Sequence, residues 1–353
     1  MTPRTSDILE QLAQRRSLSD IQADHMFHAL LNGELAPAQA GAFLMGLRVK
    51  GEDSTDLAAG VRAGLAHALD IPGLSGVRID TCGTGGDNAN SFNCSTAVAL
   101  FLAEMGYQVV KHGNRAVSSS CGSADVLEAL GVPLETNPGE VAAKLAARKF
   151  VFLFAPAYHP AFRHIMPVRR ELGIRTLFNL MGPLLNPARP THQLIGVGHP
   201  DTLFIMAEAL LLTGVERALV VHGAGGFDEL TTFGPARCYL VADGIMEKTA
   251  VNPEKLGFTR HNPEDVAVRD KAHAVGVLQE ILAGKGPEAM VQMVALNLAA
   301  CLYLLEPGRR LIECAESARS AVRQGVSSHV LHGNARSSFQ GGFQDGLEGG
   351  PHA

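Results

Sequence analysis

Hydrophobic positions divide the chain into a helical first part and a longer part in which strands alternate with helices. Residues 5–70 show helical spacing only, and residues 35–49 and 55–69 are two of the expected helices. Two earlier helices are expected to begin at polar caps, Ser6-Asp7 and the Ser-Leu-Ser-Asp segment 17–20. Pro72-Gly73 ends this helical part.

Short apolar runs rich in valine, leucine and phenylalanine predict strands in the second part. These runs are residues 77–81, 108–111, 150–154, 194–197, 218–222 and 238–241. Helical segments between several of them favour an α/β fold with a doubly wound, mostly parallel sheet. Ligands of such sheets bind beyond the carboxyl ends of the strands, so the loops that follow the strands are candidate binding loops.

Residues 162–187 interrupt this alternation with a short helix (168–172) and a segment rich in turn residues (181–187). We expect this segment to pack on the N-terminal helices, which would create a cleft between two lobes. The predicted domains are a small helical domain (1–72 with about 162–188) and a larger α/β domain (73–161 and 189–333). The tail, 334–353, is rich in Gly, Ser and His and is expected to be disordered.

Composition narrows the class of protein. The 353 residues are 46% hydrophobic, and a net charge of -5 argues against a general nucleic-acid binder, although a local basic groove would not show in this value. Six scattered cysteines without a CxxC pair suit a reducing cytoplasm. The N-terminus has no apolar signal core, and the longest apolar run, 294–305, is too short to span a membrane. We expect a cytoplasmic protein without a membrane segment.

Two successive loops have the composition of phosphate-binding loops. Gly83-Thr84-Gly85-Gly86-Asp87 follows a strand and precedes a helix, so its backbone amides and the helix N-terminus favour anionic oxygens. The segment Lys111 to Arg115 follows the next strand, and its lysine ammonium suits a phosphate. Arg115 could equally bind a phosphate or pair with a carboxylate of the fold. His112 could equally face an aromatic ligand or make a structural hydrogen bond. Further hydroxyl and amide donors are Asn93, Ser95, Thr96, Ser118, Ser119 and Ser123.

Two other segments supply charge of opposite sign. Asp228-Glu229 follows a strand and a glycine-rich turn; alone the pair would be read as a solvated turn, but beside a phosphate site it suits Mg²⁺. Arg169 and Arg170 lie on different sides of a helix, so one can enter the cleft while the other stays solvated. Cys82, Cys94 and Cys121 are expected to fill loop positions rather than act as nucleophiles.

Taken together, these motifs resemble the anthranilate phosphoribosyltransferases over about residues 5–330. The matching blocks are GTGGD (83–87), NCST (93–96), KHGNR (111–115), SSSCGSADVLEALG (118–131), HPAFRHIMPVRRELGIRTLFNLMGPLLNP (159–187) and VVHGAGGFDEL (220–230). The resemblance implies a two-domain fold of the nucleoside phosphorylase/phosphoribosyltransferase type and a homodimer formed through the helical lobes. It also implies transfer of 5-phosphoribose from phosphoribosyl pyrophosphate to the amine of anthranilate, with release of pyrophosphate, in tryptophan biosynthesis.

The resemblance also implies the roles of individual residues. Anthranilate would contact Gly83, Asn114 and Arg169, with His112, His159 and Pro183 along its path, and a pair of Mg²⁺ ions would be held with the diphosphate by Ser95, Asp228 and Glu229. The donor would be bound by Gly83, Gly86, Asp87, Ser91, Asn93, Cys94, Ser95, Thr96, Lys111, His112, Gly113, Asn114, Arg115, Ala116, Val117, Ser118, Ser119 and Ser123. Phe162 departs from the family, where tyrosine is common at this position.

Two rival interpretations share this architecture. A pyrimidine-nucleoside phosphorylase has a different lysine-serine loop in place of Lys111 to Arg115. A non-catalytic nucleic-acid-binding relative would lack parts of the metal or acceptor site and would show a basic groove, whereas this chain keeps those residues and is acidic. Transfer to a substituted aminobenzoate is a third alternative, which the sequence leaves open.

Overall fold

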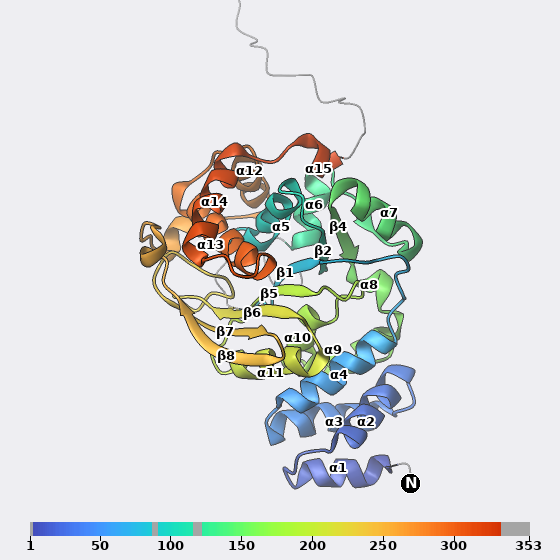
Figure 1. The fold of residues 1–353 in the computed structure, drawn as a ribbon. Helices are drawn as coiled ribbons and strands as arrows, with labels where there is room; N and C mark the ends of the chain where they lie inside the picture. The colour runs from blue at the N-terminus through green and yellow to red at the C-terminus, as the bar shows by residue number, and fades with distance from the viewer. Residues whose placement is uncertain (1–2, 87–90, 116–121, 333–353) are drawn as a thin grey trace, which may run out of the picture.

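The computed structural model describes residues 3–86, 91–115 and 122–332 (Figure 1). Five of the expected donor-site residues lie outside this part of the chain: Asp87, Ala116, Val117, Ser118 and Ser119. Cys121 and the tail 334–353 also lie outside it.

The N-terminal part is helical, as expected, and consists of α1 (Thr5–Ala13), α2 (Asp20–Asn32), α3 (Pro37–Lys50) and α4 (Ser54–Ala66). Ser19 begins α2 with a capping box, in which the Gln22 amide donates to the Ser19 hydroxyl and the Ser19 amide donates to the Gln22 side chain at 2.9 Å. The cap expected for α1 at Ser6-Asp7 is wrong. Helix α1 begins at Thr5, so Ser6 and Asp7 lie inside its first turn, and the N-cap residue is Arg4, whose side chain has no acceptor for a helix amide. The Asp7 carboxylate pairs instead with the Arg4 guanidinium at 2.9 Å.

The second part forms one eight-stranded sheet in the order β3-β4-β2-β1-β5-β6-β7-β8. Strands β1 to β6 pair in parallel, and β7 and β8 are antiparallel, so the prediction of a mostly parallel sheet is confirmed. The bounds are β1 (Ile79–Gly83), β2 (Val109–Gly113), β3 (Leu134–Glu135), β4 (Phe150–Phe154), β5 (His192–Gly196), β6 (Arg217–His222), β7 (Ala236–Ala242) and β8 (Ile245–Val251). Strands β3 and β8 were not predicted, and β1 extends to Gly83, into the expected glycine loop.

Helices cover both faces of the sheet (Figure 1). One face packs on α5 (Cys94–Glu104) and α13 (Glu288–Leu305), with α14 (Leu311–Gln324) packed on α13. The other face packs on α11 (Thr202–Thr213), which in turn contacts α4 of the N-terminal helices. Helix α13 has the length and hydropathy of a membrane span, but 72% of it is buried inside the protein, as expected for a core helix. The remaining helices of this part are α6 (Ser123–Ala129), α7 (Pro138–Arg148), α8 (Ala155–Tyr158), α12 (Lys271–Leu282), α15 (Ser328–His332), and the 3-10 turns η3 (Glu254–Leu256) and η4 (Pro263–Val266).

The segment between β4 and β5 returns to the N-terminal helices. It contains η1 (Pro160–His164), α9 (Met166–Leu172), α10 (Phe178–Met181) and η2 (Gly182–Leu184). Turn η1 packs on α2, α9 on α3, and α10 on α4. Val168 and Met181 belong to the same hydrophobic cluster as Phe27 and Phe43 of the N-terminal helices. The packing expected for this segment is therefore observed.

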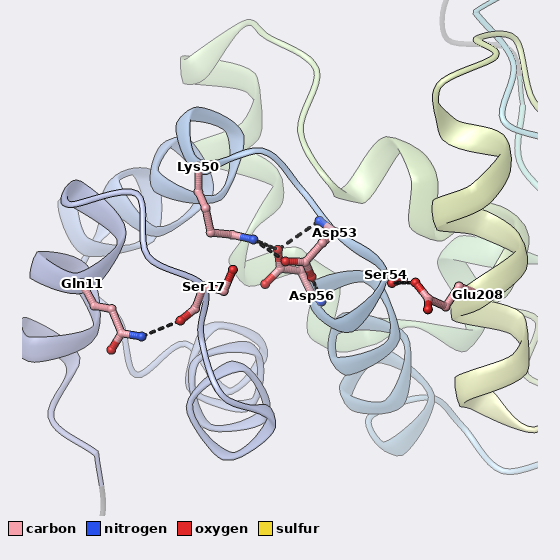
Figure 2. Close-up of polar contacts among 7 residues, drawn as sticks. All are labelled: Gln11, Ser17, Lys50, Asp53, Ser54, Asp56 and Glu208. Carbon is pink, nitrogen blue, oxygen red and sulfur yellow. Dashed lines mark hydrogen bonds and ion pairs between the residues drawn. The ribbon is translucent and has the colours of Figure 1, made fainter.

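An ion cluster around the buried Lys50–Asp56 pair fixes the corner between α3 and α4 (Figure 2). The Lys50 ammonium lies 2.6 Å from the Asp53 carboxylate and 2.7 Å from that of Asp56. Asp53 also accepts the Asp56 amide at 2.9 Å and so caps α4. One residue further on, the Ser54 hydroxyl donates to Glu208 of α11, which ties this corner to the sheet domain.

Candidate active site

The carboxyl ends of β1, β5 and β6 lie side by side and carry the first candidate loop. Gly83 at the end of β1 is in register with Gly196 of β5, which is in register with Val221 of β6. The next amide, Thr84 N, donates to Gly196 O at 2.9 Å. The glycine loop and the loop after β6 therefore meet at one edge of the sheet, as expected for a parallel sheet.

Glycine is required in the first loop because an acidic side chain lies directly against it. A Cβ atom at position 83 would be 2.2 Å from Asp228 Oδ2. The Gly85 amide donates to this same oxygen at 2.8 Å, and Gly85 has a φ of +64°, which disfavours other residues. The loop is thus held by the carboxylate that the sequence assigned to metal binding.

Ser95 and Glu229 join the N-terminus of α5 to the same site. The Ser95 amide donates to Glu229 Oε1 at 3.2 Å, while Thr81 Oγ1 donates to the Ser95 carbonyl at 2.8 Å. Asn93 is the N-cap of α5, and Ser91 forms an isolated bridge with Ala267. Cys94 and Thr96 are completely buried, so their side chains do not lie at the exposed edge.

Lys111 lies beneath this loop rather than in solvent. Its ammonium donates to the Thr81 carbonyl at 2.5 Å and to Ser95 Oγ at 3.3 Å, and the residue is only 2% exposed. Asp80 is buried nearby and accepts the Asn186 amide at 2.8 Å. Burial raises the pKa of Asp80 to about 6, although the positive charge of Lys111 and the Asn186 hydrogen bond lower it.

The predicted metal ligands fit a hard divalent cation. Ser95, Asp228 and Glu229, together with Thr81, which was not predicted as a ligand, line a cavity of about 10 Å³, which has room for about one water-sized species. Their hydroxyl and carboxylate oxygens are ligands that Mg²⁺ prefers. In the part of the chain that the structure describes, no cluster of three or more His, Cys, Asp or Glu side chains could hold a metal alone. An ion here would need oxygens from a bound substrate, which is how Mg²⁺ commonly binds.

The second loop closes on the start of α6. A Cβ atom on Gly113 would be 2.7 Å from the Ser123 hydroxyl, so glycine allows these two predicted donor residues to approach. Asn114 is exposed at the end of β2. Arg115 adopts the second of its two expected arrangements: it pairs with the Glu128 carboxylate at 2.7 Å and stacks on Phe154, 5.5 Å from the ring centre.

A line of edge-to-face rings leads from this loop to Arg169. Successive ring centres are 5.3 Å apart for His112 and His159, 5.2 Å for His159 and Phe162, and 5.6 Å for Phe162 and Phe178. The Arg169 guanidinium lies 5.3 Å from the centre of the Phe178 ring. The structure therefore connects three of the predicted acceptor residues through two phenylalanines, one of which is the unusual Phe162.

Burial sets the protonation state along this line. It lowers the pKa of His112 to about 3, helped by neighbouring His159 and Lys111, so the His112 ring is neutral at pH 7. Burial also lowers the pKa of His159, whose Nε2 lies 2.8 Å from the Leu185 carbonyl. Pro183 is buried, and its carbonyl accepts the Gln193 side chain at 3.0 Å.

Several side chains near the site are buried or hydrogen-bonded in ways that do not suit a catalytic role. Burial raises the pKa of the Cys82 and Cys94 thiols well above the ordinary value, so neither is an activated nucleophile. His222, at the end of β6, has a structural partner: its Nδ1 lies 2.8 Å from the Val197 carbonyl. Arg170 is exposed while Arg169 is half-buried, in agreement with the expectation that one of this pair is solvated.

Three site residues were not singled out from the sequence: Asp80, Asn186 and Arg175. Asp80 lies inside a strand and carries no motif of its own. Asn186 approaches it from a segment 106 positions later, and sequence spacing does not show this contact. Arg175 reaches the glycine loop, with Nη2 3.5 Å from the Gly85 carbonyl.

Comparison with known proteins agrees with this fold and site. Residues 75–328 match the model of the glycosyl transferase family a/b domain, and residues 6–68 match the helical bundle domain of a glycosyl transferase family. The class of protein is therefore a glycosyl transferase.

The relatives define the family more narrowly. The anthranilate phosphoribosyltransferase of Oleidesulfovibrio alaskensis is 57% identical over 327 residues, 93% of this chain and 99% of that protein. The Nitratidesulfovibrio vulgaris enzyme of the same name is 54% identical, over 94% of this chain and 100% of that protein. The chain belongs to the anthranilate phosphoribosyltransferase family, as the sequence motifs indicated.

Solved structures show the same architecture. The crystal structure of anthranilate phosphoribosyltransferase from Thermus thermophilus has a TM-score of 0.84 and 39% identity, and the match covers 92% of this chain and 97% of that one. The Saccharomyces cerevisiae enzyme, solved in complex with phosphoribosyl pyrophosphate and Mg, shares the fold at a TM-score of 0.82 and 24% identity, over 93% of this chain and 95% of that one.

Proposed function

We propose that the chain transfers 5-phosphoribose from phosphoribosyl pyrophosphate to the amine of anthranilate. The products are N-(5-phosphoribosyl)anthranilate and pyrophosphate, and the reaction belongs to tryptophan biosynthesis. One observation carries the proposal: the glycine loop, the N-terminus of α5 and the Asp228-Glu229 pair meet at one sheet edge, and a line of rings runs from the neighbouring loop to Arg169.

Donor binding follows from the chemistry of this edge. The Gly83–Gly86 loop, the hydroxyl of Ser95 and the Lys111 ammonium offer donors to a diphosphate. We assign Mg²⁺ binding to Ser95, Asp228 and Glu229 and expect a pair of ions with the donor diphosphate. Bound Mg²⁺ would neutralise the negative charge that develops on the departing pyrophosphate.

Acceptor binding follows from the line of rings. The Arg169 guanidinium would hold the anthranilate carboxylate, and Asn114 would orient its ring and amine. His112, His159, Pro183 and Gly83 would line the path. Anthranilate's aromatic amine is already neutral at pH 7, so the neutral His112 ring need not remove a proton before attack. These residues act by aligning the amine with the sugar carbon and by excluding water, which would otherwise hydrolyse the donor.

We also propose the assembly and the setting. The helical domain comprises residues 1–72 with about 162–188, and the chain forms a cytoplasmic homodimer through this domain. Large apolar side chains support the interface: Ile21 of α2 is 73% exposed, and Met45 and Val49 of α3 are each 44% exposed. Analytical sedimentation of the wild type and of an Ile21→Asp/Met45→Asp variant tests this, and we expect a dimeric wild type and a monomeric variant. If both proteins are monomeric, the dimer is refuted. If both are dimeric, the assigned interface is refuted.

The reaction is tested by following anthranilate fluorescence with purified protein, phosphoribosyl pyrophosphate and Mg²⁺, with and without EDTA. We expect loss of signal that requires both donor and metal. No loss from folded protein with metal present would refute the proposed function. A parallel assay of uridine cleavage by phosphate covers the nucleoside phosphorylase alternative, in which uridine rather than anthranilate would be consumed.

A further inference from the structure

The segment after α9 places an arginine on the donor loop. Gly173, with a φ of +63°, ends α9, and Arg175 follows in an exposed position. The Arg175 Nη2 atom lies 3.5 Å from the Gly85 carbonyl, at the limit of hydrogen bonding. A Cβ atom at position 86 would lie 1.8 Å from this nitrogen, so glycine at 86 leaves the space that the guanidinium occupies.

One peptide of the loop is therefore contacted from two parts of the chain. The Gly85 amide donates to Asp228 Oδ2 at 2.8 Å, and the Gly85 carbonyl faces Arg175. Asp228 comes from the loop after β6, whereas Arg175 comes from the segment that packs on the N-terminal helices. The arginine thus brings positive charge from the helical side to the same short loop that Asp228 holds from the sheet side.

The guanidinium has hydrogen-bonding capacity left for an anion. A guanidinium carries five donors, and among the residues that the structure describes Arg175 makes one long contact, with a neutral carbonyl. Within the described ranges, no carboxylate lies within ion-pair distance of it, whereas Arg115 in the second loop is paired with Glu128. An exposed arginine fork beside a phosphate-type glycine loop suits bidentate binding of phosphate oxygens.

We propose that Arg175 is a donor-binding residue that takes the diphosphate of phosphoribosyl pyrophosphate from the exposed side of the glycine loop. The buried Lys111 ammonium would stabilise the negative charge of the same diphosphate from the inner side of the loop. This inference rests on the proposed function and extends it. Arg169 and Arg175 then give one short segment a cation for each substrate. The competing explanation is that Arg175 only holds the glycine loop in place through its contact with the Gly85 carbonyl and does not bind the donor.

The test compares Arg175→Gln, Arg175→Lys and, as a matched control, Arg170→Gln, since Arg170 is an exposed arginine of the same segment. Calorimetry of phosphoribosyl pyrophosphate with Mg²⁺, without anthranilate, measures donor affinity independently of turnover. Steady-state assays then give KM for each substrate.

We expect Arg175→Gln to raise the donor Kd and the donor KM roughly tenfold, the effect of losing a charge-assisted hydrogen bond. The KM for anthranilate should change less than about twofold, Arg175→Lys should recover part of the loss, and Arg170→Gln should match wild type. An unchanged donor Kd in Arg175→Gln, or an equal rise in both KM values, would overturn the assignment. Wild-type protein that neither binds the donor nor consumes anthranilate would instead refute the proposed function itself.

Discussion

Replacing Lys50 with methionine removes the cation of the α3–α4 corner while keeping the length of its apolar stem. The Lys50 and Asp56 side chains are 4% and 2% exposed, so the variant leaves the Asp56 carboxylate buried without its counter-ion. Breaking a buried pair in this way costs about 3–5 kcal/mol. The second partner, Asp53, is 41% exposed and adds at most about 1 kcal/mol. We therefore expect the free energy of unfolding to fall by about 3–5 kcal/mol.

Urea unfolding followed by circular dichroism measures this loss. The matched control is Arg62→Met, which breaks the pair of Arg62 with Asp24, whose side chains are about 40% exposed, and should cost no more than about 1 kcal/mol. The double variant Lys50→Met/Asp56→Leu should recover much of the stability, because it removes the uncompensated charge as well. Equal losses for Lys50→Met and Arg62→Met would refute the reasoning.

The pH dependence of this variant has a definite sign. Burial raises the pKa of Asp56, and the Lys50 hydrogen bond counteracts this effect. Without Lys50 the folded-state pKa rises further above the unfolded value, so the folded protein binds the Asp56 proton more tightly than the unfolded chain does. The loss of stability relative to wild type should therefore be largest near neutral pH and should shrink as pH falls.

Three further predictions concern the site. Arg169→Ala should raise the KM for anthranilate at least about tenfold and the KM for phosphoribosyl pyrophosphate far less, because the lost guanidinium is assigned to the carboxylate of the acceptor; equal changes in both constants would contradict this role. Glu229→Gln should raise the Mg²⁺ concentration needed for half-maximal activity roughly tenfold, measured by titrating metal into EDTA-treated enzyme, and an unchanged requirement would exclude Glu229 as a ligand. His112→Asn should reduce the fall in the free energy of unfolding at acid pH. The pKa of His112 is about 3 in the folded protein and near 6.5 in the unfolded chain, so the wild type loses stability as the pH falls from about 6.5 towards 3. Urea unfolding at several pH values measures this, and an equal pH dependence in the variant would contradict it.

The fold could be predicted wherever residues repeat at the spacing of one element. The run 150–154 is apolar throughout and became β4 with the same bounds, because a strand covered on both faces needs no polar position. Strand β8 was missed because Glu247, Lys248 and Thr249 lie on an edge strand and are exposed. The α1 cap was misplaced because the helix begins at Thr5, one residue before Ser6, so the two polar residues lie inside its first turn instead of preceding it.

The sequence predicted those site residues that belong to short motifs, but not the residues that tertiary packing brings to them. The glycine loop and Asp228-Glu229 were recognised by residue type and position after strands, and the structure brings them into contact. Their relation to Arg175 and Asn186 depends on how the returning segment packs, which is a property of the tertiary fold. The role of Arg115 could not be decided from the sequence either, since Glu128 becomes its partner only when α6 folds back on the second loop.

The hydrophobic cluster beneath the sheet has a consequence for how this architecture can evolve. Phe27 and Phe43 of the N-terminal helices, Met206 of α11 and Val220 of the sheet all belong to one continuous core. The family models divide the sequence at about residue 70, yet no separate core exists on the N-terminal side within the described residues. The helical part is thus not a transferable module. A chimera that exchanges the N-terminal helices between relatives would also have to exchange the α11 surface that packs on them. Substitutions in the N-terminal helices and in α11 should therefore occur together during evolution.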